Sequence, residues 1–174
     1  MKKLLLIASL AFALTMQAQD KWTEYATSQS APSTGMRSIS IVDDNVTWLS
    51  NSCGTTGCTA IRRYSKTVDG GLTWTTAAID LGASSTNLEI ANIHGVSANV
   101  AYAAVFPKAT GALGGIWKTE NGGTSWTRQS TASYNDGASF TNVVYFWGDN
   151  EGLAMGDPVG GYYEVYRTTN GGTN

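Results

Sequence analysis

Thr119-Glu-Asn-Gly-Gly-Thr-Ser-Trp126 decides the fold, because the chain repeats this stretch at nearly regular spacing. The same pattern appears 52 residues earlier as Thr67-Val-Asp-Gly-Gly-Leu-Thr-Trp74. It appears again as Thr168-Thr-Asn-Gly-Gly-Thr-Asn174, which stops one residue before the position of the tryptophan. Trp22, like Trp74 and Trp126, is followed by threonine, and it lies 52 residues before Trp74. A repeat of this length is typical of folds built from recurring supersecondary units.

A second unit recurs upstream of each copy, at 39–48, 93–102 and 144–153. Each is a β-rich run broken by an Asp/Asn turn, which predicts a strand, a tight turn and another strand. The sequence after the leader shows no sustained 3.6-residue apolar period, so we expect essentially no helix. Each period then holds four strands, which predicts an all-β fold of four-stranded antiparallel β-propeller blades. The blades are expected at 36–79, 90–131 and 141–174, the last one truncated.

The turn between the third and fourth strands has a local explanation. A short Asp or Asn side chain accepts hydrogen bonds from backbone N–H groups of its own turn, and the glycines supply positive φ angles. The threonine hydroxyl closes the loop from the other side, and the tryptophan ring covers it. We therefore expect structural roles for these residues: Thr67, Asp69, Gly71, Trp74, Thr119, Asn121, Gly123, Trp126, Thr168, Asn170 and Gly172.

The eight-residue pattern resembles the Asp-box, or BNR repeat, of sialidases, sortilin-type receptors and photosystem II assembly-factor-type propellers. In such families ligands approach the end of the blades away from the Asp-boxes. This resemblance therefore directs the search for ligand contacts to the loops at that end. The candidates there are Tyr134, Asp136, Asp157, Tyr162 and Tyr163.

Three blades cannot close a ring, because closed propellers use roughly 4 to 8 blades. Residues 20–26 contain Trp22 without a preceding turn motif, so we expect an orphan outer strand that pairs with the last blade. We interpret the chain as the N-terminal piece of a longer protein. The alternative is a half-ring that self-association completes.

Residues 1–18 combine two lysines, an apolar run and small polar residues, as in a secretory signal peptide. The apolar run is too short for a permanent membrane span, so the mature chain from 19 to 174 is expected to be secreted or on the cell surface, with the periplasm as a further location. In that setting Cys53 and Cys58 favour a local disulfide, with two free thiols or half of a metal site as alternatives. A metal is not expected, because His94 is the only histidine and no second cysteine pair exists.

The formal net charge is −2, and the basic residues are scattered, so no cationic stripe is available for nucleic acid. The sequence shows no catalytic constellation and no cofactor motif. We therefore expect a binding scaffold for a protein or a glycan. The alternatives are a glycoside hydrolase, sialidase-like or with two carboxylates, whose active site needs further blades, and an assembly factor of the photosystem-associated type.

Overall fold

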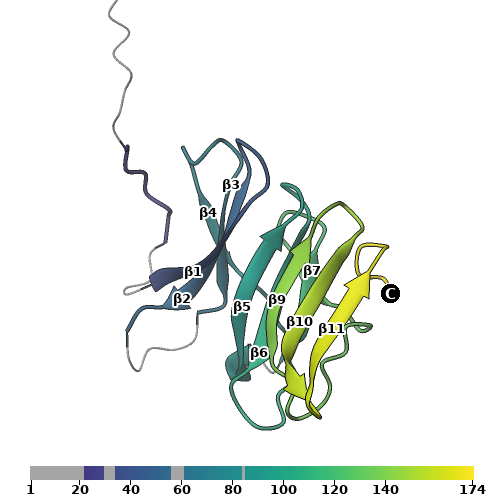
Figure 1. Cartoon of the computed structure of the whole chain (residues 1–174). Helices are drawn as coiled ribbons and strands as arrows, with labels where there is room; N and C mark the ends of the chain where they lie inside the picture. Colours follow the sequence, from purple (N-terminus) through teal and green to yellow (C-terminus); the bar gives the residue numbers. More distant parts are fainter. Residues whose placement is uncertain (1–21, 30–33, 56–60, 84) are drawn as a thin grey trace, which may run out of the picture.

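The computed structural model describes residues 22–29, 34–55, 61–83 and 85–174, which form three antiparallel sheets (Figure 1). The first sheet contains β1 (Thr34–Ile41), β2 (Thr47–Cys53), β3 (Arg63–Thr67) and β4 (Thr75–Ala78). The second contains β5 (Leu88–Gly95), β6 (Ala101–Pro107), β7 (Gly115–Thr119) and β8 (Thr127–Arg128). The third contains β9 (Thr141–Phe146), β10 (Gly152–Val159) and β11 (Tyr162–Thr168). The helical content of the described residues is one 3-10 turn, η1 (Ser85–Asn87).

The three sheets stack as a row, with the second sheet in the middle (Figure 1). The first strands of the sheets lie side by side, since β5 contacts both β1 and β9. Within each sheet the strands follow chain order, as in a meander. The described residues therefore form an all-β, incomplete propeller whose row of blades is open, as the repeat predicted.

The middle position of the second sheet explains its composition. Alternate side chains of a strand point to opposite faces, so a sheet covered on both sides needs apolar residues at every position. The run from Ala101 to Val105 in β6 is fully apolar and fully buried. Ala101, Ala103 and Val105 pack toward the first sheet, whereas Tyr102 and Ala104 pack toward the third.

The two contacts between sheets are hydrogen-bonded as well as apolar. Between the first two sheets, Ser38 and Ser40 of β1 accept hydrogen bonds from backbone N–H groups of β5 at 3.0 and 2.9 Å. Between the second and third, the Asn92 side chain both accepts from Val144 N, at 2.9 Å, and donates to Val144 O, at 3.2 Å. These bonds satisfy polar groups at the buried contacts and fix how the strands align.

Residues 22–29 form no strand within the described chain, and Trp22 is fully exposed. The segment lies beside β4, where Thr76 donates its hydroxyl to the Thr27 carbonyl at 3.0 Å. Its predicted role as an outer strand stays a prediction. The signal peptide at 1–18 and Cys58 lie outside the described residues, so the leader and the disulfide with Cys53 stay predictions too. No described helix is long and apolar enough to cross a membrane.

One loop differs from its prediction. The sequence placed Asp157, Tyr162 and Tyr163 in loops, but β10 continues to Val159 and only Gly160 and Gly161 turn the chain. Their φ angles of +61° and +91° suit a tight two-residue hairpin, which glycine forms without steric cost. Tyr162 and Tyr163 therefore belong to strand β11 and not to a loop.

Candidate functional site

The Thr-x-Asp/Asn-x-Gly turns, called motif turns here, are held by their own side chains. In the first, Asp69 Oδ1 accepts from Thr73 N at 2.9 Å, and Asp69 Oδ2 accepts the Thr73 hydroxyl at 2.6 Å. Thr67 Oγ1 donates to Asp69 at 2.8 Å and accepts from Gly71 N at 2.9 Å. These bonds, those from Thr73 above all, lower the pKa of the Asp69 carboxyl.

The other two motif turns repeat this arrangement with asparagine. Asn121 Oδ1 accepts a hydrogen bond from Ser125 N at 2.9 Å, and Asn170 Oδ1 accepts one from Asn174 N at 2.9 Å, as Asp69 Oδ1 does from Thr73 N. A carboxylate and two amides thus perform the same task, which needs an acceptor and no charge. Their side chains are used inside the turns, and this arrangement favours a structural role over a catalytic one.

Each later motif turn is fastened to the sheet before it. Tyr64 of the first sheet donates its hydroxyl to Gly122 O at 3.2 Å, and Lys66 donates to the same carbonyl at 3.0 Å. In the same way, Tyr102 of the second sheet donates to Gly171 O at 2.9 Å. The turns therefore carry part of the contact between neighbouring sheets.

Trp126 shows how the motif tryptophan is used between two sheets. Its ring lies against Trp48, with centroids 6.3 Å apart and planes at 85°, and against Tyr64, with centroids 5.9 Å apart. It is 8% exposed. An indole that follows the motif turn of the second sheet thus fills the gap toward the first sheet, which is a large apolar contribution to this contact.

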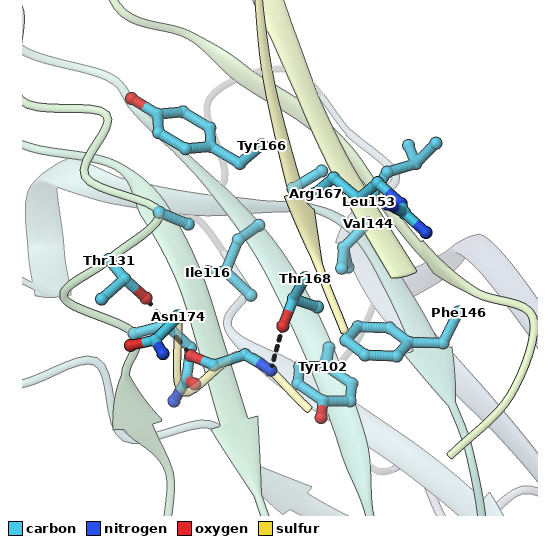
Figure 2. Close-up of a pocket in the computed structure, with 14 residues that line it drawn as sticks. Tyr102, Ile116, Thr131, Val144, Phe146, Leu153, Tyr166, Arg167, Thr168 and Asn174 are labelled. Carbon is cyan, nitrogen blue, oxygen red and sulfur yellow. Dashed lines mark hydrogen bonds between the residues drawn. The ribbon is translucent and has the colours of Figure 1, made fainter. Parts of the chain in front are cut away.

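The corresponding place between the second and third sheets is a cavity of about 60 Å3, the β11 pocket (Figure 2). Its apolar wall consists of Tyr102, Ile116, Val144, Phe146, Ala154 and Tyr166. Tyr102 and Phe146 stack at one end with ring centroids 3.9 Å apart, and Tyr166 lies at the other.

The strand register shows that this pocket corresponds to the site that Trp126 occupies between the first two sheets. Trp48 pairs with Lys66 across β2 and β3, and Tyr102 pairs with Lys118 across β6 and β7. Ile116 precedes its motif threonine by three residues, as Tyr64 does. Tyr102 and Ile116 therefore take, toward the third sheet, the positions that Trp48 and Tyr64 take toward Trp126.

The rim of the β11 pocket is polar. Its polar lining residues are Gln129, Thr131, Arg167, Thr168 and Asn174. In Figure 2, Asn174 lies beside Thr131, and Arg167 lies on the opposite side of Thr168.

The pocket opens beside the outer edge of β11. In the first sheet the equivalent edge, that of β3, pairs with β4, and in the second sheet that of β7 pairs with β8. Within the described residues no strand pairs with the outer edge of β11. Its backbone N–H and C=O groups can hydrogen-bond an added strand, which is the geometry of β-augmentation.

None of the ligand candidates predicted from sequence lines the β11 pocket. Tyr134 is fully buried, packed against Tyr166 and against the backbone of Gly156. Asp136 is exposed and caps its own turn, accepting from Ala138 N at 2.8 Å. Tyr134 is therefore a packed side chain, whereas Asp136 is available to solvent.

The remaining candidates lie on the hairpin of β10 and β11. Asp157 is exposed and accepts a hydrogen bond of 2.6 Å from the Asn142 amide. Tyr162 and Tyr163 are 81% and 67% exposed next to the turn. The structure thus brings Asp157 and the two tyrosines to one end of one hairpin, which is a solvent-facing surface and not a pocket.

The described residues show no arrangement typical of hydrolysis. Tyr134 and Glu164 interact electrostatically, but burial and the Glu164 carboxylate raise the pKa of the phenol, the opposite of what a nucleophilic tyrosinate needs. No group of three metal-ligating side chains gathers in the described part of the chain. Arg37, which would have suited a substrate carboxylate, pairs instead with Glu89 at 2.8 Å.

Two solved structures resemble this chain. One is YCF48 bound to D1 peptide, with a TM-score of 0.52 and 19% sequence identity over 82% of this chain and 38% of that chain. Another is YCF48 from Cyanidioschyzon merolae, with a TM-score of 0.53 and 16% identity over 88% of this chain and 42% of that chain. The chain therefore spans less than half the length of either, and the likeness shows the propeller fold alone.

No protein-family model matches the chain, and no curated protein sequence matches it.

Proposed function

We propose that this protein is a binding scaffold for proteins, and that it takes an extended peptide segment with an aromatic anchor at the β11 pocket. The β11 pocket is the main support for this proposal, because it corresponds to the site that Trp126 occupies between the first two sheets. It also lies beside the outer edge of β11, which can pair with an added strand. An indole buried there would remove apolar surface from water, and hydrogen bonds to β11 would orient the peptide.

Two further observations support a protein partner. The neighbour in the solved complex is YCF48 bound to D1 peptide, so a propeller of this kind can hold a peptide. The shared hydrogen bonds of the three motif turns support assigning the chain to the Asp-box propellers. The lysine-led apolar leader of the sequence supports a location outside the cytoplasm, which is part of the same proposal.

The alternative functions have less support. A glycoside hydrolase needs two carboxylates on either side of the scissile bond. Asp136 instead accepts a hydrogen bond from the backbone of its own turn, and Asp157 accepts one from the Asn142 amide. Within the described residues, neither aspartate is paired with a second carboxylate. A glycan ligand would rest on the exposed Tyr162 and Tyr163 alone. The assembly-factor alternative is a special case of peptide binding, and it rests on likeness of fold.

Fluorescence anisotropy with a labelled peptide tests the proposal. The probe carries the sequence Thr-Ser-Trp-Thr-Arg-Gln-Ser, copied from 124–130, where Trp126 and β8 occupy the equivalent place in the second sheet. We expect saturable binding of one peptide per chain. The same peptide with alanine for tryptophan is expected to bind at least about 10-fold more weakly, since the indole supplies most of the buried apolar area.

A matched pair of variants locates the binding. Ala154→Leu fills the floor of the β11 pocket, whereas Met155→Leu changes the next residue of β10, on the opposite, partly exposed face. We expect Ala154→Leu to weaken binding at least about 10-fold and Met155→Leu to leave it unchanged. Equal binding by all three proteins, or binding that ignores the tryptophan of the probe, contradicts the proposal.

A further inference from the structure

Four pairs of residues in this chain carry the same reactive sequence, an aspartate or asparagine followed by glycine. They are Asp69-Gly70, Asn121-Gly122, Asp136-Gly137 and Asn170-Gly171. In such a pair the glycine nitrogen can attack the side-chain carbonyl carbon of the preceding residue and close a five-membered succinimide ring. Glycine favours this attack because it has no Cβ to hinder the approach. The fold decides which of the four pairs can reach the required geometry.

In all three motif turns the glycine nitrogen already donates a hydrogen bond. Each acceptor is the backbone carbonyl of an asparagine in the turn between the first two strands of the same sheet. The bonds run from Gly70 N to Asn45 O at 3.0 Å, from Gly122 N to Asn99 O at 2.9 Å, and from Gly171 N to Asn150 O at 2.9 Å. An attack by any of these nitrogens would therefore have to break a bond that joins two turns of a sheet.

The side chain of the motif turn is held in place as well. Asn121 Oδ1 accepts from Ser125 N at 2.9 Å, four residues ahead, and Asn121 Nδ2 donates to Ser125 Oγ at 2.8 Å. Thr119 Oγ1 donates to the same Oδ1 at 3.1 Å. The amide group is thus fixed by hydrogen bonds to Thr119 and Ser125, and its carbon is not free to swing toward Gly122 N.

Asp136-Gly137 lacks both restraints. It lies in the connector between β8 and β9, where Asp136, Gly137 and Ala138 are exposed. In the part of the chain that the structure describes, no group accepts a hydrogen bond from Gly137 N. Asp136 Oδ1 accepts from Ala138 N at 2.8 Å, only two residues ahead. This bond spans Gly137, so it brings the carboxyl carbon alongside the nitrogen that would attack it.

The reaction at this pair needs only water. Gly137 N bonds to the side-chain carboxyl carbon of Asp136 and gives up its proton to solvent, while a carboxyl oxygen leaves as water. Water then opens the succinimide. Where it breaks the bond between the nitrogen and the main-chain carbonyl carbon, the chain continues through the side-chain carbon as an isoaspartate. The net change is an isomerisation, so no oxidant, reductant or metal is consumed.

We propose that Asp136 is a site of spontaneous isoaspartate formation in the folded protein, and that the motif turns protect Asn121 and Asn170 from deamidation. Deamidation uses the same ring closure but releases ammonia. A neutral amide is attacked more readily than a carboxylate anion, so Asn-Gly pairs react faster than Asp-Gly pairs in a flexible chain. The fold therefore reverses the order of reactivity.

The modification would change a connector that is anchored at both ends. Tyr134 is fully buried and Ser139 is 4% exposed, whereas the residues between them are exposed. An isoaspartate adds one carbon to the backbone between these anchors, so the added length must be taken up by the exposed part. None of Asn121, Asp136 and Asn170 lines the β11 pocket, so this proposal is independent of the proposed function.

Peptide mapping by mass spectrometry after incubation in neutral buffer tests the proposal. In the folded wild type we expect isoaspartate to accumulate at 136, detected by enzymatic methylation of its new carboxylate, while Asn121 and Asn170 stay amides. In urea these two asparagines should become the fastest sites. Their rates should exceed those in the folded protein at least about 100-fold, because a closed turn must open before it reacts. Equal deamidation of Asn121 in both conditions, or an unchanged Asp136 in the folded protein, overturns the proposal.

Gly137→Ala tests the attacking atom. The φ angle of Gly137 is not positive, and nothing lies within 4 Å of an added Cβ, so the variant should retain the wild-type circular dichroism spectrum. The methyl group hinders the attack, so isoaspartate should form several-fold more slowly. Gly148→Ala is the matched control, since Gly148 has equal space and follows a tryptophan. Isoaspartate formation at the same rate in both variants means that Gly137 N does not attack, which contradicts the proposal.

Thr119→Val tests the protection of Asn121. It removes the hydroxyl that donates to Asn121 Oδ1 and accepts from Gly123 N at 2.9 Å, and it keeps the shape of a buried side chain. Deamidation of Asn121 in the folded variant should be at least about 10-fold faster than in the wild type, with Asp136 unaffected. Thr127→Val, at an exposed position of β8, should leave both sites unchanged.

Ser125→Ala keeps the test decisive if Thr119→Val does not fold. It removes only the exposed Oγ that accepts from Asn121 Nδ2, and the bond from the backbone N of residue 125 remains. Deamidation of Asn121 should again be faster than in the wild type. A wild-type rate in every folded variant would show that these hydrogen bonds do not protect the asparagine.

Discussion

Tyr102 donates its hydroxyl to the carbonyl oxygen of Gly171 at 2.9 Å, and this bond ties the second sheet to the motif turn of the third. The tyrosine is 1% exposed, and its ring stacks on Phe146. Tyr64 makes the equivalent bond to Gly122 one sheet earlier. The repeat is thus fastened by a tyrosine hydroxyl and a glycine carbonyl, groups that the turn motif itself does not reveal.

Tyr102→Phe should lower the free energy of unfolding by about 1–3 kcal/mol, because it leaves the buried Gly171 carbonyl without its donor while the ring stays packed. Urea unfolding followed by circular dichroism measures this change. Tyr145→Phe is the control, since Tyr145 is half exposed, and it should change the free energy by less than about 0.5 kcal/mol. Equal effects of the two substitutions would mean that the Tyr102 bond contributes nothing.

Gly123→Ala should destabilise the protein by more than about 2 kcal/mol. Gly123 has a φ of +95°, and a Cβ there would overlap the hydroxyl end of Tyr64, whose ring is part of the seat of Trp126. Gly160→Ala is the matched control, because its φ of +61° is also positive but nothing lies within 4 Å of the added Cβ. It should cost about 1 kcal/mol of backbone strain. Thermal melts that rank the two in the reverse order would contradict the packing role of Gly123.

The blades were predictable from sequence because their signals are local. The motif turn is held by side chains within seven residues, from Thr67 to Thr73, so its residue types can be recognised without any tertiary information. The Asp/Asn turns and alternating strands are local in the same sense. The fold class followed from these units and from their spacing.

The β11 pocket was missed because it depends on faces of two sheets. Tyr102 and Ile116 come from the second sheet, Phe146 and Ala154 from the third, and their meeting depends on which face of each strand is turned inward.

The burial of Tyr134 could not be predicted from sequence for a similar reason. It lies in a connector between β8 and β9, where loops usually face solvent, and the sequence suggested an accessible ligand contact. The connector instead places the ring against Gly156, where a side chain at 156 would collide with it. A glycine inside a strand often marks such a close approach, but its partner cannot be identified from sequence.

Asp69→Asn should make the stability of the protein less sensitive to acid. Hydrogen bonds from Thr73 and Thr67 lower the pKa of Asp69 in the folded state from its ordinary value of 3.8. Their stabilisation is therefore present above that unfolded value, and it is lost as the pH falls through the lowered folded pKa. Asparagine serves at the equivalent Asn121 and keeps the Thr73 N–H bonded without titrating.

Melting midpoints measured from neutral pH to about pH 2 test this expectation. The midpoint of Asp69→Asn should fall less steeply below about pH 4 than that of the wild type. Asp69→Ala should have a lower midpoint at every pH, because no acceptor remains for Thr73. Asp149→Asn, at an exposed position in the β9–β10 turn, removes the same charge and should retain the wild-type slope.

His94 should make the protein less stable as the pH falls from about 7.5 to 5.5. Burial against Tyr145 and Phe146 lowers its pKa below the ordinary value of 6.5, although a hydrogen bond with the Phe146 backbone acts in the opposite direction. Between the lowered pKa and 6.5 the unfolded chain binds more protons than the folded one, so the free energy of unfolding rises with pH across this window. Below this pH window the free energy of unfolding no longer changes with pH through His94.

Because His94 is the only histidine of the chain, urea unfolding of wild type and His94→Gln at several pH values isolates its effect. A wild type whose stability is flat across this range, or a His94→Gln variant with the same slope, would show that the imidazole titrates alike in both states.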